Sequence, residues 1–135
     1  MIDDSTARGL EGAALSVLSH AWAPYSRFRV GAALLDAEGR IHVGCNVENA
    51  SLGLSSCAER SAVFRAVAEG AREFVAVAIA SDAETLTPPC GACRQVLLEF
   101  APHLQVLLVN SRGERRSHSL EELLPLAFHD FRVEP

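Results

Sequence analysis

The first helical pattern lies near the start of the chain. Between about residues 5 and 22, apolar side chains recur every three or four positions, which is the spacing of an amphipathic helix. These apolar residues are Leu10, Ala13, Ala14, Val17, Leu18 and Ala21. Ser5 or Thr6 can cap the start with a side-chain oxygen, and Pro24 ends the helix because proline has no backbone N–H. We expect this helix to pack against a sheet and to have no chemical role.

Two runs of strand-forming residues follow and predict a β-hairpin. The first covers residues 28–35 and the second covers residues 40–47, with a turn signal at residues 36–39. Asn46 and Glu48 fall at the far end of this hairpin. Because side chains separated by two along an extended chain point the same way, these two polar groups can meet one hydroxyl-bearing ligand.

Residues 74–80 and 105–109 form two further runs, which are mainly apolar. Such runs suit central strands that are covered on both faces. Helical segments begin at Cys57 and Cys90 and end near Gly70 and Phe100. Strand, helix and strand in this order give a right-handed crossover and parallel strands. Residues 114–118 follow the turn at 110–113 too closely for a crossover, so they must return antiparallel.

Composition and charge narrow the class of protein. The chain has 135 residues, 49% of them hydrophobic, which suits a single domain over residues 1–135. Its net charge of −5, from 12 basic and 17 acidic side chains, argues against binding to nucleic acid. The acidic N-terminus is unlike a signal peptide, and no apolar run is long enough to span a bilayer. We expect a cytoplasmic protein that binds a small uncharged substrate and neither nucleic acid nor membrane.

Four cysteines allow either two disulfides or a metal site. In a cytosolic chain, metal binding is the favoured use of such residues. Cys57, Cys90 and Cys93 lie at predicted helix starts, whereas Cys45 lies in a predicted strand and is expected to be a small buried hydrophobe. The five histidines fall outside these positions and are expected to be surface or hydrogen-bonded residues, not ligands.

The three cysteines at helix starts suit a catalytic zinc site. A structural zinc site is closed by four protein ligands, whereas a catalytic site has three and leaves the fourth position to water. Zinc lowers the pKa of that water from about 15.7 to roughly 7. Glu59 lies two residues beyond Cys57 and can reach the water and a substrate without binding the metal. Pro88 and Pro89 favour a helix start at Cys90, where the helix dipole favours a thiolate.

Two arginines adjoin the candidate ligands. Three thiolates leave the zinc centre with a net charge of about −1, which weakens the metal as a Lewis acid. Arg60 and Arg94 are close in sequence to Cys57 and Cys93. An arginine that donates a hydrogen bond to a ligand sulfur would withdraw charge and restore the acidity of the water.

The cysteine motifs resemble the signature of zinc-dependent nucleoside and nucleobase deaminases. The motifs are Cys57-Ala58-Glu59 and Pro89-Cys90-Gly91-Ala92-Cys93. With cysteine at position 57 where other members carry histidine, and with matching blocks at residues 25–34, 44–50 and 122–125, the chain is most similar to the small cytidine deaminases. The resemblance implies a three-layer α/β/α sandwich with a mixed five-stranded sheet, one Zn²⁺ per chain and a homotetramer.

The same resemblance implies an activity and a set of site residues. The reaction is hydrolytic deamination of cytidine, and of 2′-deoxycytidine, to the uridine product and ammonia in pyrimidine salvage, with Glu59 as the proton shuttle. The implied substrate contacts are Phe28 in the pyrimidine pocket, Asn46 and Glu48 on the ribose, Ala58 on the base and Phe128 from a neighbouring subunit. From the residues alone, Asn46 and Glu48 could instead cap a loop, and Phe28 could face the core.

Other functions remain open at this stage. Leu52 stands where the family commonly has an aromatic residue, which would suit a deaminase of a modified cytosine nucleoside, similar to blasticidin S deaminase. A non-catalytic zinc module would need a fourth ligand and has no use for an uncoordinated Glu59. A polynucleotide editor would need a basic groove and stacking aromatics, against which the net charge and the 6% aromatic content count.

Overall fold

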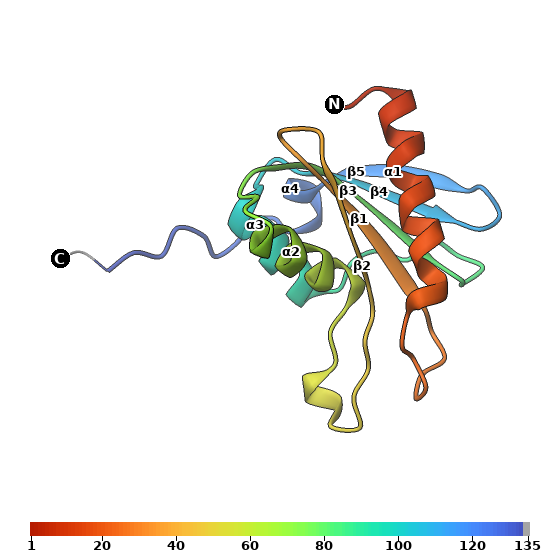
Figure 1. The fold of residues 1–135 in the computed structure, drawn as a ribbon. Helices are drawn as coiled ribbons and strands as arrows, with labels where there is room; N and C mark the ends of the chain where they lie inside the picture. Colours follow the sequence, from red (N-terminus) through yellow and green to blue (C-terminus); the bar gives the residue numbers. More distant parts are fainter. Residues whose placement is uncertain (134–135) are drawn as a thin grey trace.

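The computed structural model describes residues 1–133 and shows a mixed sheet between two helical layers (Figure 1). Its strands are β1 (Val30–Asp36), β2 (Ile41–Cys45), β3 (Phe74–Ser81), β4 (Gln105–Asn110) and β5 (Arg115–Ser119). They lie in the order β2-β1-β3-β4-β5, with β3 and β4 parallel and the other neighbours antiparallel. The predicted hairpin, parallel crossover pair and antiparallel last strand are therefore confirmed.

Helices cover both faces of this sheet because side chains alternate along each strand. On one face, Val77 and Ile79 of β3 share a core with α2 (Ala58–Ala68), α3 (Gly91–Phe100) and α4 (Leu120–Leu123). On the other face, alanines of β3 pack under α1 (Asp4–Val17). The small side chains on that face let α1 lie close to the sheet. The predicted three-layer α/β/α sandwich is confirmed.

Two glycines allow close contact between helix and strand. A Cβ added at Gly31 would lie 2.2 Å from the carbonyl oxygen of Ala14 in α1. A Cβ at Gly44 would lie 2.3 Å from the backbone nitrogen of Ala62 in α2. Neither position can carry a side chain unless the helix moves. Gly44 in this way sets the distance between β2 and the helix that begins next to Cys57.

The first helix differs from its prediction at both ends. Its N-cap is Asp3, whose carboxylate accepts a hydrogen bond from Thr6 N at 2.7 Å, so the predicted caps Ser5 and Thr6 were wrong. The α-helix ends at Val17 and continues as the 3-10 helix η1 (Leu18–His20). Within residues 1–133, no helix is both long enough and apolar enough to cross a membrane.

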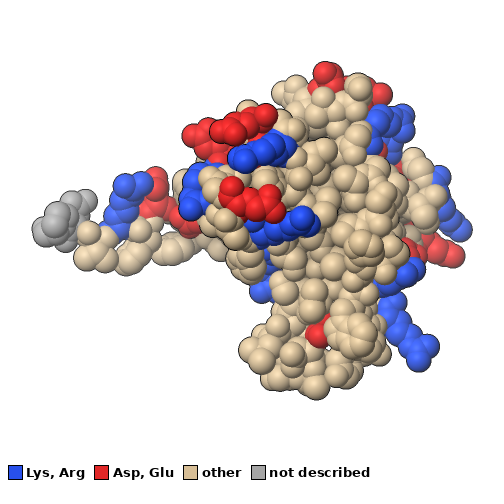
Figure 2. All heavy atoms as spheres, in the orientation of Figure 1, with Lys and Arg blue, Asp and Glu red and all other residues tan. Residues whose placement is uncertain are grey.

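Two loops project together from one end of the sheet, and we call residues 21–29 and 46–56 the lobe (Figure 1). A 3-10 helix, η2 (Leu52–Leu54), lies within its second loop. Figure 2 shows the lower part of this projection as mostly uncharged on the visible face, with an acidic group within it and a basic side chain at its edge, whereas the helical body carries many acidic and basic groups. The C-terminal segment leaves the body as an extended arm and exposes Leu126, Phe128 and Phe131. Both features leave apolar side chains without cover from their own chain.

Candidate active site

Three cysteine sulfurs meet at one point at the start of α2 and α3. The Sγ atoms of Cys57 and Cys90 are 3.9 Å apart, those of Cys90 and Cys93 are 3.3 Å apart, and all three lie within 4.8 Å of one another. Tetrahedral zinc with Zn–S bonds of about 2.3 Å separates its sulfur ligands by about 3.8 Å. Within residues 1–133 this is the only such cluster of potential metal ligands, and no fourth protein ligand joins it. The donor set fits zinc with one open position.

Helix starts bring these sulfurs together. Cys57 is the N-cap of α2 and Cys90 is the N-cap of α3, while Cys93 lies in the first turn of α3. Because α3 connects the parallel strands β3 and β4, its N-terminus lies beyond their carboxyl ends, where open α/β sheets place ligands. Burial is graded across the cluster, since Cys93 is buried, Cys57 is half-buried and Cys90 is exposed. The open side of the cluster therefore faces solvent.

Charge around the sulfurs favours a thiolate at Cys57. The nearby Cys93 thiol and the Arg60 guanidinium lower the pKa of Cys57 to about 5, although burial acts in the opposite direction. Contact with Cys57 and burial raise the pKa of Cys93. Arg60 donates from Nη2 to Cys57 Sγ at 3.4 Å, as the sequence predicted for an adjoining arginine. Its buried Nε atom has no hydrogen-bond partner among residues 1–133.

Glu59 lies buried beside the sulfurs without joining them. Its side chain is 4% exposed, in the first turn of α2. Burial raises the pKa of Glu59, and the negative charge at Cys57 raises it further. A buried carboxyl group with a raised pKa holds a proton more readily than an exposed one, which suits an acid–base group. The position matches an acid–base group next to a metal site.

Arg94 makes different contacts from those predicted. Its Nε donates to Pro89 O at 2.8 Å, and its Nη1 donates to Leu123 O at 2.6 Å. The side chain thus fastens the segment before α3 to α4 and makes no hydrogen bond with a cysteine sulfur. Sequence proximity could not separate Arg94 from Arg60, because both adjoin a ligand and only the helix geometry decides which one turns toward sulfur.

Asn46 and Glu48 join the two loops of the lobe. Asn46 Oδ1 accepts from Val30 N at 2.8 Å, and its Nδ2 donates to Phe28 O at 2.7 Å. Glu48 Oε1 accepts from the backbone N–H groups of Tyr25 and Ser26 at 3.0 and 3.1 Å. The contacts expected of loop caps are therefore present. Each side chain still keeps donor or acceptor capacity for a ligand.

The lobe adjoins the sulfur cluster through its second loop. Val47 and Ser56 exchange backbone hydrogen bonds of 2.9 Å in both directions, and Ser56 immediately precedes Cys57. Asn46 and Glu48 flank Val47, so the structure brings them to the side of the sulfurs. The backbone pairing thus joins the loop that carries Asn46 and Glu48 to the residue before Cys57.

The remaining predicted substrate residues occupy different surroundings. Phe28 in the lobe is 39% exposed, so much of its ring is open to solvent. Ala58 is fully buried at the first position of α2. Phe128 lies on the exposed C-terminal arm, where its carbonyl oxygen accepts from Gln95 Nε2 at 2.8 Å. Leu52 is exposed within η2.

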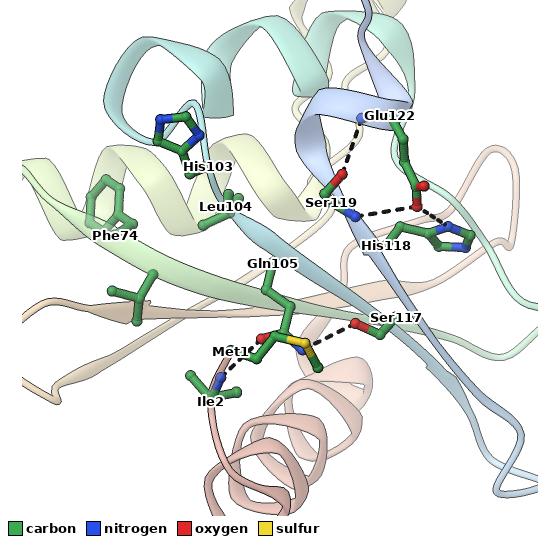
Figure 3. A pocket seen from close by; sticks show the side chains of 11 residues that line it. Met1, Ile2, Phe74, His103, Leu104, Gln105, Ser117, His118, Ser119 and Glu122 are labelled. Carbon is green, nitrogen blue, oxygen red and sulfur yellow. Dashed lines mark hydrogen bonds and ion pairs between the residues drawn. The ribbon is translucent and has the colours of Figure 1, made fainter.

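A separate hollow of ≈ 770 Å³ lies at the opposite end of β3 and β4, near Phe74 and Gln105 (Figure 3). Its polar groups already bond to one another. Gln105 accepts from Ile2 N and donates to Ser117 Oγ, while His118 Nδ1 lies 2.8 Å from Glu122 Oε1. None of its lining residues belongs to the sulfur cluster or the lobe. The hollow offers few free polar groups to orient a ligand.

Two groups of polar residues were not singled out from the sequence. Ser26 lies in the lobe, where its Oγ donates to Glu48 Oε2 and accepts from Phe28 N. His42 is 2% exposed and lies between Asp36 and Glu69. A serine in a turn and a histidine in a strand have no distinctive spacing, so only the fold reveals their partners.

Comparison with known proteins agrees with this geometry. Residues 6–109 match the family described as the cytidine and deoxycytidylate deaminase zinc-binding region. A cytidine deaminase of Halalkalibacterium halodurans is 49% identical over 116 residues, which cover 85% of this chain and 88% of that protein. A cytidine deaminase of Mycobacterium tuberculosis is 43% identical over 119 residues, which cover 88% of this chain and 86% of that one.

Solved structures show the same fold. The crystal structure of cytidine deaminase from Burkholderia pseudomallei superposes with a TM-score of 0.86 at 48% identity, covering 90% of this chain and 98% of that chain. The crystal structure of cytidine deaminase from Mycobacterium tuberculosis gives a TM-score of 0.81 at 40% identity, covering 94% and 98%. In each comparison, the similarity extends over nearly the full length of both chains.

Proposed function

The chain belongs to the family of the cytidine and deoxycytidylate deaminase zinc-binding region, and we propose that it removes the amino group of cytidine and 2′-deoxycytidine by hydrolysis. The products are uridine or 2′-deoxyuridine and ammonia, as expected for an enzyme of pyrimidine salvage. Water supplies the oxygen that replaces the amino group at C4 of the pyrimidine.

The observation that carries this proposal is the meeting of three sulfurs beside one uncoordinated, buried carboxyl group. Cys57, Cys90 and Cys93 hold one zinc per chain in this proposal. Bound zinc supplies a Lewis acid that makes water nucleophilic at neutral pH. Arg60 offsets the charge of the sulfurs through its contact with Cys57. A purely structural site would be closed by a fourth protein ligand.

Glu59 moves the protons of the reaction. Its carboxylate accepts a proton from the attacking water and delivers it to N3 of the pyrimidine. The carboxylate then takes the second proton, from the hydroxyl group now on C4, and transfers it to the amino group, which leaves as ammonia while C4 becomes a carbonyl. The buried position of Glu59 keeps its carboxyl group apart from bulk water and raises its pKa toward the range such transfers need.

The lobe and the start of α2 hold the substrate. The backbone N–H of Ala58, in the first turn of α2, is unpaired within the helix and can donate to the base. Phe28 packs against the pyrimidine ring. Asn46 and Glu48 bind the ribose hydroxyls through the hydrogen-bond donors and acceptors that their contacts within the loops do not use.

We also propose that the enzyme is a cytoplasmic homotetramer with shared active sites. The exposed Phe128 on the extended arm is suited to enter a neighbouring subunit, and the apolar side chains of the lobe and arm gain cover in such an assembly. The cytoplasm keeps the three ligand thiols reduced and therefore able to bind zinc.

A substrate panel tests the proposed function. The zinc-loaded protein is given cytidine, 2′-deoxycytidine, cytidine 5′-monophosphate and free cytosine, and deamination is followed by ultraviolet absorbance. We expect both nucleosides to react and free cytosine to react far more slowly, because binding of the sugar holds C4 in place. The monophosphate is expected to be a poor substrate, because a chain with a net charge of −5 does not favour binding of a phosphate group. No turnover of either nucleoside would contradict the proposal.

A further inference from the structure

Ser26 links the proposed sugar-binding and base-binding residues of the lobe. Its Oγ donates to Glu48 Oε2 and accepts a hydrogen bond from Phe28 N at 3.0 Å. Its backbone N–H donates to Glu48 Oε1 at 3.1 Å. One serine therefore contacts both oxygens of the carboxylate and the backbone of the aromatic residue.

The acceptor capacity of Glu48 is largely used by these contacts. A carboxylate has about four lone-pair positions, two on each oxygen. The backbone N–H groups of Tyr25 and Ser26 occupy Oε1, and the Ser26 hydroxyl occupies one position on Oε2. One position on Oε2 remains free. A single sugar hydroxyl is the group that can fill it.

The surrounding backbone is held in an uncommon conformation. Arg27, the next residue, has φ of 60°, in the left-handed region that residues other than glycine seldom adopt. Such a conformation persists where neighbouring contacts determine it. Here Arg27 N donates to Ala23 O at 2.9 Å, and the Glu48 carboxylate holds the two residues before it. The turn is therefore built around the carboxylate.

The same hydrogen bonds keep Glu48 ionised. The Ser26 hydroxyl and the Ser26 backbone N–H hold the pKa of this carboxyl below its usual value. An ionised carboxylate accepts a stronger hydrogen bond from a hydroxyl group than a neutral acid does. Loss of the Ser26 hydroxyl would remove one donor and free Oε2 to rotate away from the sugar.

We propose that Ser26 is a positioning residue that fixes the Glu48 carboxylate so that one lone pair of Oε2 receives a sugar hydroxyl. The enzyme would thereby prefer nucleosides that carry this hydroxyl to nucleosides that lack it. This inference rests on the proposed nucleoside deaminase function and adds Ser26 to the residues that set its specificity. Ser26 acts through Glu48 and contacts neither the reacting atoms nor the metal ligands.

The test compares cytidine with 2′,3′-dideoxycytidine, which lacks the 2′ and 3′ hydroxyls of the ribose and keeps the 5′ hydroxyl. We expect Ser26→Ala to lower kcat/KM for cytidine by about tenfold or more, since a hydrogen bond to a charged group is lost. The value for dideoxycytidine should change by less than about threefold, within the usual scatter of surface substitutions. Ser26→Thr keeps the hydroxyl and should restore cytidine activity. Ser51→Ala, at a lobe serine whose side chain makes no capping bond, is the matched control.

A double variant tests whether Ser26 acts through Glu48. Once Glu48→Gln has removed the carboxylate, adding Ser26→Ala should cause little further loss on cytidine. Melting temperature and zinc content are measured for every variant, to show that the fold and the metal centre are kept.

Three outcomes would overturn the proposal. Equal losses on cytidine and dideoxycytidine would make Ser26 a support of the loop alone. If the losses of kcat/KM caused by Ser26→Ala and Glu48→Gln add fully in the double variant, Ser26 does not act through Glu48. If the unchanged protein deaminates both nucleosides equally well, the sugar-binding role of Glu48 fails, and the role of Ser26 fails with it. If the unchanged protein leaves cytidine untouched, the proposed function itself fails, which is a separate result.

Discussion

Each candidate ligand cysteine presents its sulfur from a different environment. Cys57 and Cys90 are N-caps at the starts of two helices, so their side chains feel the positive ends of two helix dipoles. Cys93 is buried in the first turn of α3 and cannot move without disturbing the core. The candidate metal site is thus built into the helix starts, and we expect loss of one of these cysteines to affect both metal binding and the fold.

We expect the Cys90→Ala protein to lose zinc and much of its stability, because the free energy of metal binding contributes to the free energy of folding. The unchanged protein should carry about one zinc per chain by metal analysis. Cys45→Ala is the matched control, since Cys45 lies in β2 outside the sulfur cluster and should keep its zinc. Full zinc content in Cys90→Ala would remove this residue from the ligand set.

At the scale of elements, the sequence predicted the strands that are marked by a continuous run of apolar residues. The runs at residues 74–80 and 105–109 form the central strands β3 and β4. Both strands are buried along nearly their whole length, so their sequences are nearly continuously apolar and easy to recognise. The end of the hairpin was less predictable. β2 stops at Cys45 because Asn46 turns its side chain to the backbone of Phe28 and Val30, sixteen or more residues away. Contacts at such separation leave no periodic signal.

A cluster of hydrogen-bonded polar side chains ties the hairpin to the end of α2. His42 in β2 lies 2.9 Å from Asp36 in β1 and 3.1 Å from Glu69, the C-cap of α2. Burial raises the pKa of Asp36. Hydrogen bonds from His42, from the backbone of Arg40 and Glu38 and from the Arg40 side chain outweigh that effect and hold this pKa well below its usual value.

Because the pKa of Asp36 is lowered in the folded state, its carboxylate stabilises the protein above the unfolded pKa of about 3.9. This stability is lost as the pH falls further, toward the folded pKa. We expect Asp36→Asn to lower Tm by about 5 °C or more at pH 7. The difference in Tm from the unchanged protein should persist down to about pH 5 and shrink below about pH 4.

The comparison is made between two proteins with the same zinc site, so loss of metal in acid affects both alike. Asp82→Asn removes an exposed partner of Arg29 and should change Tm little at any pH. A Tm difference for Asp36→Asn that is equally large at pH 3 and pH 7 would show that the carboxylate charge is not the stabilising feature.

At the scale of the whole molecule, the exposed apolar surface is concentrated in two places. Trp22, Tyr25, Leu52 and Leu54 lie in the lobe, and Phe128 and Phe131 lie on the C-terminal arm. The sequence alone could not place these residues, because the runs that carry them have no periodic pattern. In the proposed tetramer, the arm of one subunit completes the active site of another.

Hybrid tetramers test this sharing of active sites. Phe128→Ala and Glu59→Gln are each expected to be weak as pure proteins. In a hybrid, a subunit with intact Glu59 can receive intact Phe128 from its neighbour, so co-assembled mixtures should be more active than either parent. Light scattering checks that the mixtures are tetramers. Activity no higher than the average of the two parents would contradict the shared site.

The most direct test of the zinc and Glu59 mechanism is the turnover of Glu59→Gln, measured together with its zinc content. Glutamine fills nearly the same volume but cannot carry protons between water, N3 and the leaving amine. We expect about one zinc per chain and a loss of cytidine turnover of at least about 10²–10⁴-fold, the usual contribution of acid–base catalysis. Near-normal turnover by a fully zinc-loaded Glu59→Gln protein would contradict the mechanism.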